Sequence, residues 1–248
     1  MARLFENHPE VLLAISERAD GDLRVQTRGR PETGAIYAAN RHKFFEKSGV
    51  RPESVAASLL EHGSNVVPVG PAQAGQFIAH CDALITATPG VFVSITIADC
   101  LPVFLYDPAS HAIGLAHAGW RGLAAKIIPK TIAAMQAEFG SDPAVMFAAI
   151  GPGIGSCHYA VQADLAQKFS EYAAVEQRHG ELFLDLKLVA QKQLLAAGVA
   201  AARLEVDPDC TADFPEKYFS FRRDKPAAVQ AMAAVFGLRP PESKLQHG

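Results

Sequence analysis

Two apolar runs in the middle of the chain limit the possible folds more than any other feature. Val103–Tyr106 and Ile113–Ala116 are rich in strand-forming residues, and the segment DPASH between them is typical of a turn. A short turn between two such runs predicts an antiparallel strand pair. Further β-rich runs at Val66–Val69, Ala83–Thr86 and Val91–Ile97 indicate that this pair belongs to a larger sheet.

The hydrophobic period changes after Gly122. Apolar residues then recur every three to four positions up to Phe139, which predicts a helix ending at Gly140 with Pro129 in its first turn. Other expected elements are strands at 9–16, 144–150 and 206 onward, helices at 39–47, 161–173, 186–197 (capped by Asp185) and 225–236, an irregular loop at 17–34 and a β-like segment at 218–221.

Strands and helices follow one another without regular βαβ alternation, which favours an α+β (mixed α/β) fold over a doubly wound Rossmann sheet. We expect the helices to cover the outer faces of the sheets. The sequence contains no internal repeat and no low-complexity linker. A single domain over residues 1–248 is therefore the simplest organisation.

Composition excludes several classes of function. The 248 residues carry a formal net charge of −3 without a basic cluster, which argues against a nucleic-acid partner. Charges interrupt the apolar run near the N-terminus, and no run reaches the roughly 18 residues of a membrane helix, so neither secretion nor a membrane partner is predicted. Four cysteines are too few for a disulfide framework in a chain of this length. We expect a cytoplasmic protein with reduced thiols.

The two predicted central strands carry unusual residues at their ends. Cys100 precedes the first strand and His117 closes the second. A thiol beside an imidazole can act as a nucleophile–base pair, or the two side chains can serve as zinc ligands if a third one joins them. Spacing alone does not identify that third ligand, for which the candidates by type are His62, His80, His111 and His158.

Several segments have the composition of anion-binding sites. Arg121 lies in the run HAGWRG, where two glycines permit a tight turn and the guanidinium offers a fork of donors to phosphate or carboxylate. The run GPGIGSC is Gly-rich but matches neither a Walker A loop nor a dinucleotide fingerprint, and FSFRRD places two arginines after an aromatic segment. The sequence has no Gly-x-Ser-x-Gly, HExxH or CxxC motif, and their absence excludes, in that order, the common serine hydrolases, the zincins and the thioredoxins as classes of protein.

Four motifs together resemble a known family. TIADCLPV, HAGWRG, GPGIGSCHY and CT…YFSFRRD, between about His62 and Lys225, are similar to those of the laccase-domain family, once described as multicopper polyphenol oxidases and now regarded as purine nucleoside phosphorylases with additional adenosine deaminase activity. The resemblance implies a single domain of stacked mixed β-sheets flanked by helices, similar to cysteine-hydrolase-like deamidating toxins. It also implies a zinc site built from two histidines and one cysteine, with copper as the alternative metal.

Residue by residue, the resemblance assigns the metal ligands to His62, Cys100 and His117. His62 falls on the family's Gln-x-His-Gly motif, which here reads Leu60-Glu61-His62-Gly63. Cys100, His117 and Arg121 are the implied catalytic residues. The implied substrates are a purine nucleoside (adenosine, inosine or the methylthioadenosine class) and phosphate, and we expect a monomer.

The chain departs from the family pattern at several positions. Leu60 replaces a glutamine, Ala160 replaces a glutamate, and the N-terminal third lacks the usual glycine- and serine-containing motifs. These departures bear on the preference for purine, ribose or phosphate. Three alternatives stay open: a metal-free Cys/His hydrolase or deamidase, a copper-dependent phenol oxidase, and a non-catalytic metal-binding or interaction protein. The oxidase is the weakest of them, since the nine histidines form no His-x-His pairs for several coppers.

Overall fold

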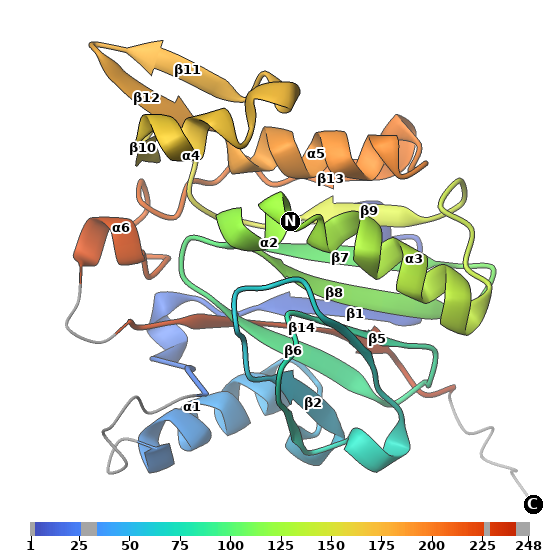
Figure 1. The fold of residues 1–248 in the computed structure, drawn as a ribbon. Helices are drawn as coiled ribbons and strands as arrows, with labels where there is room; N and C mark the ends of the chain where they lie inside the picture. The colour runs from blue at the N-terminus through green and yellow to red at the C-terminus, as the bar shows by residue number, and fades with distance from the viewer. Residues whose placement is uncertain (1–2, 26–33, 226–228, 242–248) are drawn as a thin grey trace, which may run out of the picture.

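The computed structural model describes residues 3–25, 34–225 and 229–241, and it has a mixed α+β fold. Two large mixed β-sheets stack face to face, and helices cover their outer sides (Figure 1). The order of layers is α3 and α5, then a six-stranded sheet, then a five-stranded sheet, then α1. The predicted architecture of stacked mixed sheets flanked by helices is confirmed.

The six-stranded sheet contains the predicted central strand pair. Its order is β13 (Leu204–Val206), β9 (Phe147–Ile150), β7 (Leu101–Asp107), β8 (Ala112–Ala118), β5 (Ala83–Thr86) and β3 (Val66–Pro68). β7 and β8 are antiparallel and every residue of both strands is buried. The five-stranded sheet has the order β1 (Val11–Ile15), β14 (Met232–Leu238), β6 (Phe92–Ile97), β2 (Val55–Ser58) and β4 (Phe77–Ile78).

Alternation along β7 explains how the sheets stack. Val103 and Leu105 point to a core shared with α3 and α5, whereas Phe104 and Tyr106 point to a second core shared with the five-stranded sheet. Successive side chains of a strand face opposite sides, so a strand covered on both faces must be apolar throughout. The ring of Phe104 contacts that of Phe236 with centroids 5.3 Å apart, which joins the two sheets.

Six α-helices lie within the described residues, and the sequence indicated the start or the end of two of them. The six helices are α1 (Gly34–Lys47), α2 (Trp120–Ala124), α3 (Ile127–Phe139), α4 (Ala163–Gln167), α5 (Leu186–Ala196) and α6 (Phe221–Asp224). The Asp185 carboxylate accepts the Leu188 N–H at 2.9 Å and caps α5 as predicted. Pro129 lies in the first turn of α3, and Gly140 ends that helix in the left-handed region at φ 68°.

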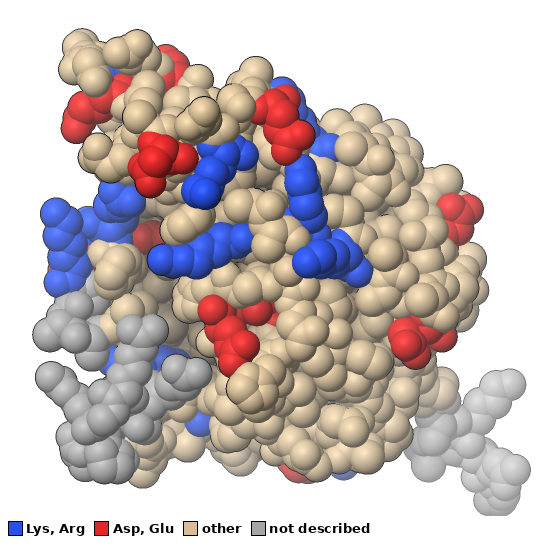
Figure 2. Space-filling model, viewed as in Figure 1, with Lys and Arg blue, Asp and Glu red and all other residues tan. Residues whose placement is uncertain are grey.

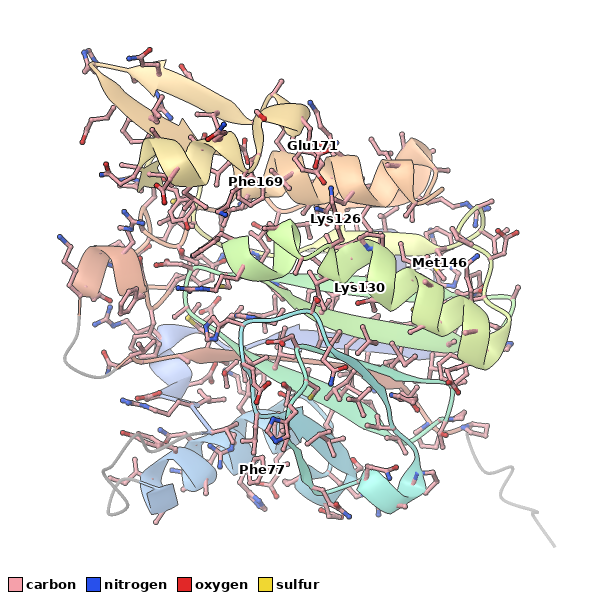
Figure 3. All side chains as sticks on the ribbon, viewed as in Figure 1. Phe77, Lys126, Lys130, Met146, Phe169 and Glu171 are labelled. Carbon is pink, nitrogen blue, oxygen red and sulfur yellow. The ribbon has the colours of Figure 1, made fainter. Side chains whose placement is uncertain are left out.

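A small three-stranded sheet projects beyond α5 (Figure 1). It consists of β10 (Ala160–Val161), β12 (Glu181–Leu184) and β11 (Val175–Arg178). Figure 3 shows Lys126, at the start of α3, and Glu171 close together where this unit meets the layer of α2 and α3, and their charged groups are 2.7 Å apart. Phe169, in the segment that connects β10 to β11, is fully buried in the core.

Four predicted elements are wrong. The strand expected from 206 onward instead ends there, since β13 spans Leu204–Val206. The expected helix at 225–236 includes residues 226–228, which lie outside the described residues, but Met232–Leu238 form β14 between β1 and β6. The alanines there indicated a helix, yet both faces of this central strand are buried, and small side chains suit that position. The segment 218–221 is not a strand, because the Ser220 hydroxyl accepts the Arg223 N–H and begins α6. The helix expected at 161–173 contracts to α4 and a 3₁₀ turn at Ser170–Tyr172.

Within the described residues, the helices are all too short or too polar to span a bilayer.

Candidate active site

A pocket of about 650 Å³ opens at the end of the central β7–β8 hairpin. That volume is in the range of cavities that bind small organic ligands. Apolar and aromatic side chains form much of its lining, among them Leu60, Ile97, Trp120 and Phe221. The same pocket is lined by all four residues that the sequence singled out, which are His62, Cys100, His117 and Arg121.

The hairpin register brings Cys100 and His117 together. Leu101 pairs with Ala118 and Pro102 with His117, so the residue before β7 lies beside the end of β8. Gly119 makes this approach possible, because a Cβ atom at that position would lie 2.7 Å from the Cys100 Sγ. Cys100 and His117 therefore lie side by side, which the sequence indicated only for a favourable register of the two strands.

His62 arrives from the loop between β2 and β3, and Asp82 holds it there. The Asp82 carboxylate accepts the N–H groups on either side of His62, from Glu61 at 3.1 Å and from Gly63 at 2.8 Å. These bonds fix His62 in the left-handed conformation at φ 62°, which is uncommon for a residue with a side chain. The Asp82 carbonyl also accepts the His117 N–H at 2.8 Å, so one residue positions both imidazoles.

The three side chains form a group with the geometry of a metal site. One nitrogen of each histidine and the Cys100 Sγ all lie within 4.8 Å of one another, and the two imidazole rings are nearly perpendicular with centroids 5.0 Å apart. The other candidates for the third ligand lie elsewhere. His80 pairs with Glu61 on the surface, His111 is exposed in the hairpin turn, and His158 contacts Asp213.

In the absence of a cation, the surroundings of the group disfavour a reactive thiolate. Burial raises the pKa of the Cys100 thiol to about 12, the adjacent Asp99 carboxylate adds to the shift, and Arg121 opposes it. Burial, with a smaller contribution from His62, lowers the pKa of His117 to about 3. Both groups are then neutral near pH 7, whereas a nucleophilic cysteine needs a lowered pKa. A bound divalent cation would favour the thiolate and the neutral imidazole together.

An orphaned nitrogen supports the same reading. The Nδ1 atom of His117 is buried and has no hydrogen-bond partner among the described residues. Buried polar atoms are nearly always paired with protein, water or metal, and each exception calls for an explanation. A thiol and two imidazoles are ligands that Zn²⁺ accepts, and three protein ligands are the number that catalytic zinc sites provide. The residues present thus fit a zinc ion.

Cationic side chains surround the mouth of the pocket. Arg121, exposed on α2, stacks on Trp120 with its guanidinium carbon 4.4 Å from the ring centroid. Arg222 of α6 bonds the Ala160 carbonyl at 3.0 Å and lies 4.9 Å from the Tyr159 ring centroid. Lys225 also lines the pocket. On the face shown in Figure 2, basic side chains gather at the level of α2 and α6. The pocket can therefore bind an anion.

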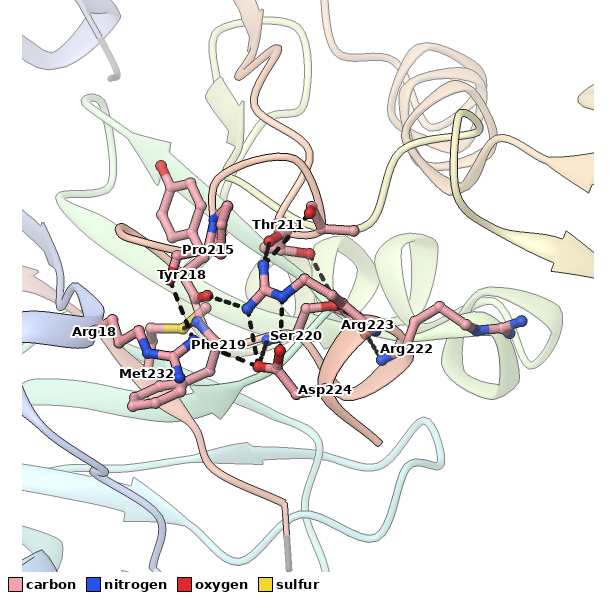
Figure 4. Close-up of polar contacts among 12 residues, drawn as sticks. Arg18, Thr211, Pro215, Tyr218, Phe219, Ser220, Arg222, Arg223, Asp224 and Met232 are labelled. Carbon is pink, nitrogen blue, oxygen red and sulfur yellow. Dashed lines mark hydrogen bonds and ion pairs between the residues drawn. The ribbon is translucent and has the colours of Figure 1, made fainter. Parts of the chain in front are cut away.

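The two arginines of FSFRRD have different roles. Arg223 is a structural residue that donates to the Thr211 carbonyl at 2.9 Å and the Tyr218 carbonyl at 2.8 Å and pairs with Asp224 (Figure 4). The Arg222 side chain extends away from that network in Figure 4 and lines the pocket. Sequence reasoning did not separate the two, nor did it identify Tyr159 or Phe221, although all of them belong to the quoted motifs.

Comparison with known proteins gives concordant results. The family model described as multi-copper polyphenol oxidoreductase laccase matches residues 27–239. A purine nucleoside phosphorylase of Deinococcus radiodurans is 36% identical over 204 residues, covering 81% of this chain and 77% of the relative. The purine nucleoside phosphorylase YlmD of Geobacillus stearothermophilus is 31% identical over 210 residues, covering 79% and 77%. The crystal structure of YlmD from that organism superimposes with a TM-score of 0.87 at 27% identity, covering 96% of this chain and 94% of YlmD.

Proposed function

The chain belongs to the multi-copper polyphenol oxidoreductase laccase family, and on that premise we propose that it is a zinc-dependent purine nucleoside phosphorylase. The observation that carries the proposal is the convergence of His62, Cys100 and His117 in a pocket whose mouth is lined by basic side chains. The names of its relatives support the reaction class, and the geometry of the pocket supports the choice of residues.

Each part of the pocket suits one part of the substrates. The apolar and aromatic lining formed by Leu60, Ile97 and Phe221 matches the flat, largely apolar faces of a purine. Leu60 and Ala160 supply no polar side-chain contacts to the base, so recognition would rest more on shape and on backbone groups. Arg121 and Arg222 present guanidinium groups suited to two oxygens of one phosphate. We expect phosphate to bind between them.

Phosphorolysis then requires positioning and charge stabilisation. A phosphate oxygen forms a bond to the anomeric carbon of the ribose while the bond from that carbon to the purine nitrogen breaks, and its electron pair leaves with the base. Arg121 and Arg222 would orient the phosphate for attack and exclude competing orientations. His62, Cys100 and His117 would hold the zinc ion, whose contribution when bound is Lewis-acid polarisation of an atom placed against it.

Phosphorolysis takes precedence over adenosine deamination in this proposal. Zinc deaminases use a carboxylate beside the metal as general acid and base. Among the described residues that line the pocket, Asp99 is the one carboxylate, and it already accepts the Thr211 hydroxyl at 2.6 Å and the Arg222 N–H at 2.7 Å. Deaminase activity is therefore proposed only as a secondary reaction. The metal-free hydrolase is disfavoured, since the Cys100 thiol has a pKa near 12.

Metal analysis and product analysis test the proposal together. Wild type and Cys100→Ala are analysed for zinc and copper by mass spectrometry, then incubated with adenosine and inosine with and without phosphate. Phosphate-dependent release of free base by the wild type, lost in the variant, is the expected result. Phosphate-independent conversion of adenosine to inosine would make the deaminase the main activity. A wild type that turns over no nucleoside would overturn the proposal.

Arg121→Gln tests the phosphate subsite. Losing one charged fork should raise the KM for phosphate about tenfold or more while the nucleoside KM changes little, since one charge-assisted contact contributes roughly 1.5–3 kcal/mol. Arg51→Gln, at an exposed position away from the pocket, is the matched control. Equal phosphate KM values for both variants would remove Arg121 from the subsite. The single domain over 1–248, the monomeric state and the cytoplasmic location stay predictions.

A further inference from the structure

A second group of metal-type ligands lies outside the pocket lining. It consists of Cys157, His158, Cys210 and Asp213, and one donor atom from each lies within 4.8 Å of all the others. None of the four lines the candidate active site. We propose that these four residues bind a structural zinc ion, separate from the metal of the pocket.

Four of the donor–donor distances within the group are close to the edges of a zinc tetrahedron. The Cys157 Sγ is 3.4 Å from an Asp213 oxygen, and the His158 Nδ1 is 3.3 Å from both the Cys157 Sγ and the other Asp213 oxygen. The Cys210 Sγ lies 3.8 Å from the His158 Nδ1. A tetrahedron with zinc–sulfur bonds of about 2.3 Å and zinc–nitrogen or zinc–oxygen bonds of about 2.0–2.1 Å has edges of roughly 3.3–3.8 Å. The protein needs little rearrangement to accept the ion.

Backbone contacts hold the two contributing loops in this arrangement. The Cys157 loop follows β9 and the Cys210 loop follows β13, and a parallel bridge joins Gly153 to Cys210. The Gly155 N–H donates to the Cys210 Sγ at 3.2 Å, a type of hydrogen bond that orients a metal-binding sulfur. A Cβ atom at Gly155 would lie 3.0 Å from the Cys157 Sγ, so a side chain there would push the sulfur outward.

The identity of the donors favours a metal over a disulfide. A bond between Cys157 and Cys210 would use two of the four donor groups and leave His158 and Asp213 paired only with each other. Two sulfurs, an imidazole and a carboxylate are together a ligand set for Zn²⁺, and four protein ligands close the coordination sphere, as in structural sites.

The position of the cluster gives the ion a structural task. Tyr159, next to His158, lines the pocket, and Thr211, next to Cys210, donates to Asp99 at 2.6 Å. Both contributing loops thus continue into one side of the pocket. A metal that joins these loops would hold that side rigid without entering the reaction. The side chains of His158 and Asp213 are 46% and 44% exposed, so the ion has a route from solvent.

Zinc stoichiometry in matched variants tests the inference. We expect about two zinc ions per chain for the wild type, one for Cys100→Ala, one for Cys157→Ala and none for the double variant. Cys81→Ser removes a buried thiol that belongs to neither group and should retain both ions. His158→Ala, at a half-exposed position, repeats the test without removing a sulfur.

Cobalt substitution identifies the ligands directly. In Cys100→Ala loaded with Co²⁺, we expect the absorption of a tetrahedral site with thiolate-to-metal charge transfer, and we expect its loss when Cys157→Ala is added. A folded Cys100→Ala that binds no metal would overturn the inference. So would unchanged metal content in Cys157→Ala, or a Cys157–Cys210 cross-linked peptide from unreduced protein purified with zinc. Because these readouts count metal and not turnover, they are independent of the proposed phosphorylase activity.

Discussion

Replacing Asp82 with alanine should weaken metal binding in the pocket without removing a ligand. The Asp82 residue is 1% exposed, and its carboxylate accepts the two N–H groups that flank His62. Without those bonds, the segment around His62 loses what holds it at φ 62°. The imidazole then has to be ordered again each time the metal binds, and affinity falls.

The expected size of the effect follows from these contacts. Losing a residue that orients a ligand typically costs 10–100-fold in metal affinity, or about 1.4–2.7 kcal/mol. Stability should fall as well, because each hydrogen bond to a buried carboxylate contributes roughly 1.5–3 kcal/mol. Glu61 is exposed, so water can satisfy its N–H group once the Asp82 carboxylate is gone. We therefore place the total loss of stability near 3 kcal/mol, toward the lower end of the sum for the two bonds.

Asp107→Ala is the matched control, because stability and metal binding must be separated. Asp107 is also buried, and its carboxylate accepts backbone N–H groups from Ala109 at 2.8 Å and from Asp142 at 3.0 Å as well as the Ser110 hydroxyl at 2.9 Å. It lies at the far end of β7 from Cys100, roughly 20 Å away at the rise of a strand. The control should lose at least as much stability and retain full affinity.

The assay is competition for zinc with a chromophoric chelator, combined with urea unfolding. Both substitutions are made in Cys157→Ala, so that the second group does not contribute to the zinc count. Affinity within twofold of the parent in Asp82→Ala would refute the argument that Asp82 positions His62. An equal loss of affinity in Asp107→Ala would mean that general destabilisation, and not positioning, governs the site.

Three further predictions follow from other contacts. Gly119→Ala places a methyl group 2.7 Å from the Cys100 Sγ and should abolish zinc binding in the pocket by equilibrium dialysis, whereas Gly70→Ala, whose nearest neighbour would be 3.9 Å away, should leave it intact. Asp107→Asn should destabilise the protein at pH 7. Burial alone would raise the pKa of Asp107, but its hydrogen-bond donors outweigh burial and lower it. The native carboxylate therefore stabilises the fold above the ordinary pKa of about 4, and its advantage over Asn should shrink in urea unfolding curves as the pH falls below that value. Asp185→Ala removes the α5 cap and should cost about 1 kcal/mol in the same assay, and an unchanged midpoint would refute the assigned cap.

The strands that build the site were predictable because their burial is encoded locally. The β7–β8 pair, the cap of α5 and the end of α3 each follow from a pattern within about fifteen residues. The strand β14 was not predictable in this way. Its sequence, MAAVFGL, is compatible with a helix by composition and becomes a strand only between β1 and β6. Its partners are more than a hundred residues away, and nothing within the segment indicates them.

The residues of the candidate site also differ in how far the local sequence identified them. Cys100 and His117 were found from their places at the strand ends, and their contact needed only the hairpin register. His62 was one of four candidates by residue type, and the family resemblance chose it. The structure explains this choice by a hydrogen bond that the Asp82 carboxylate accepts from the Gly63 N–H, nineteen residues earlier in the sequence. Arg222 and Arg223 show the limit of sequence reasoning most clearly. They are adjacent and of the same type, yet the Arg222 side chain donates to the Ala160 carbonyl and the Arg223 side chain donates to the Thr211 carbonyl.

Asp99 shows how a neighbour in sequence can have a different task from the site residue beside it. Its place next to Cys100 suggests proton transfer, but its carboxylate accepts the Thr211 hydroxyl and the Arg222 N–H. Its backbone lies in the left-handed region at φ 81°, so these bonds hold a conformation that an isolated Asp seldom adopts. Asp99 is therefore a positioning residue. It joins the segment of Cys100, the loop of the second metal group and α6, and any movement of that loop would reach the pocket through it.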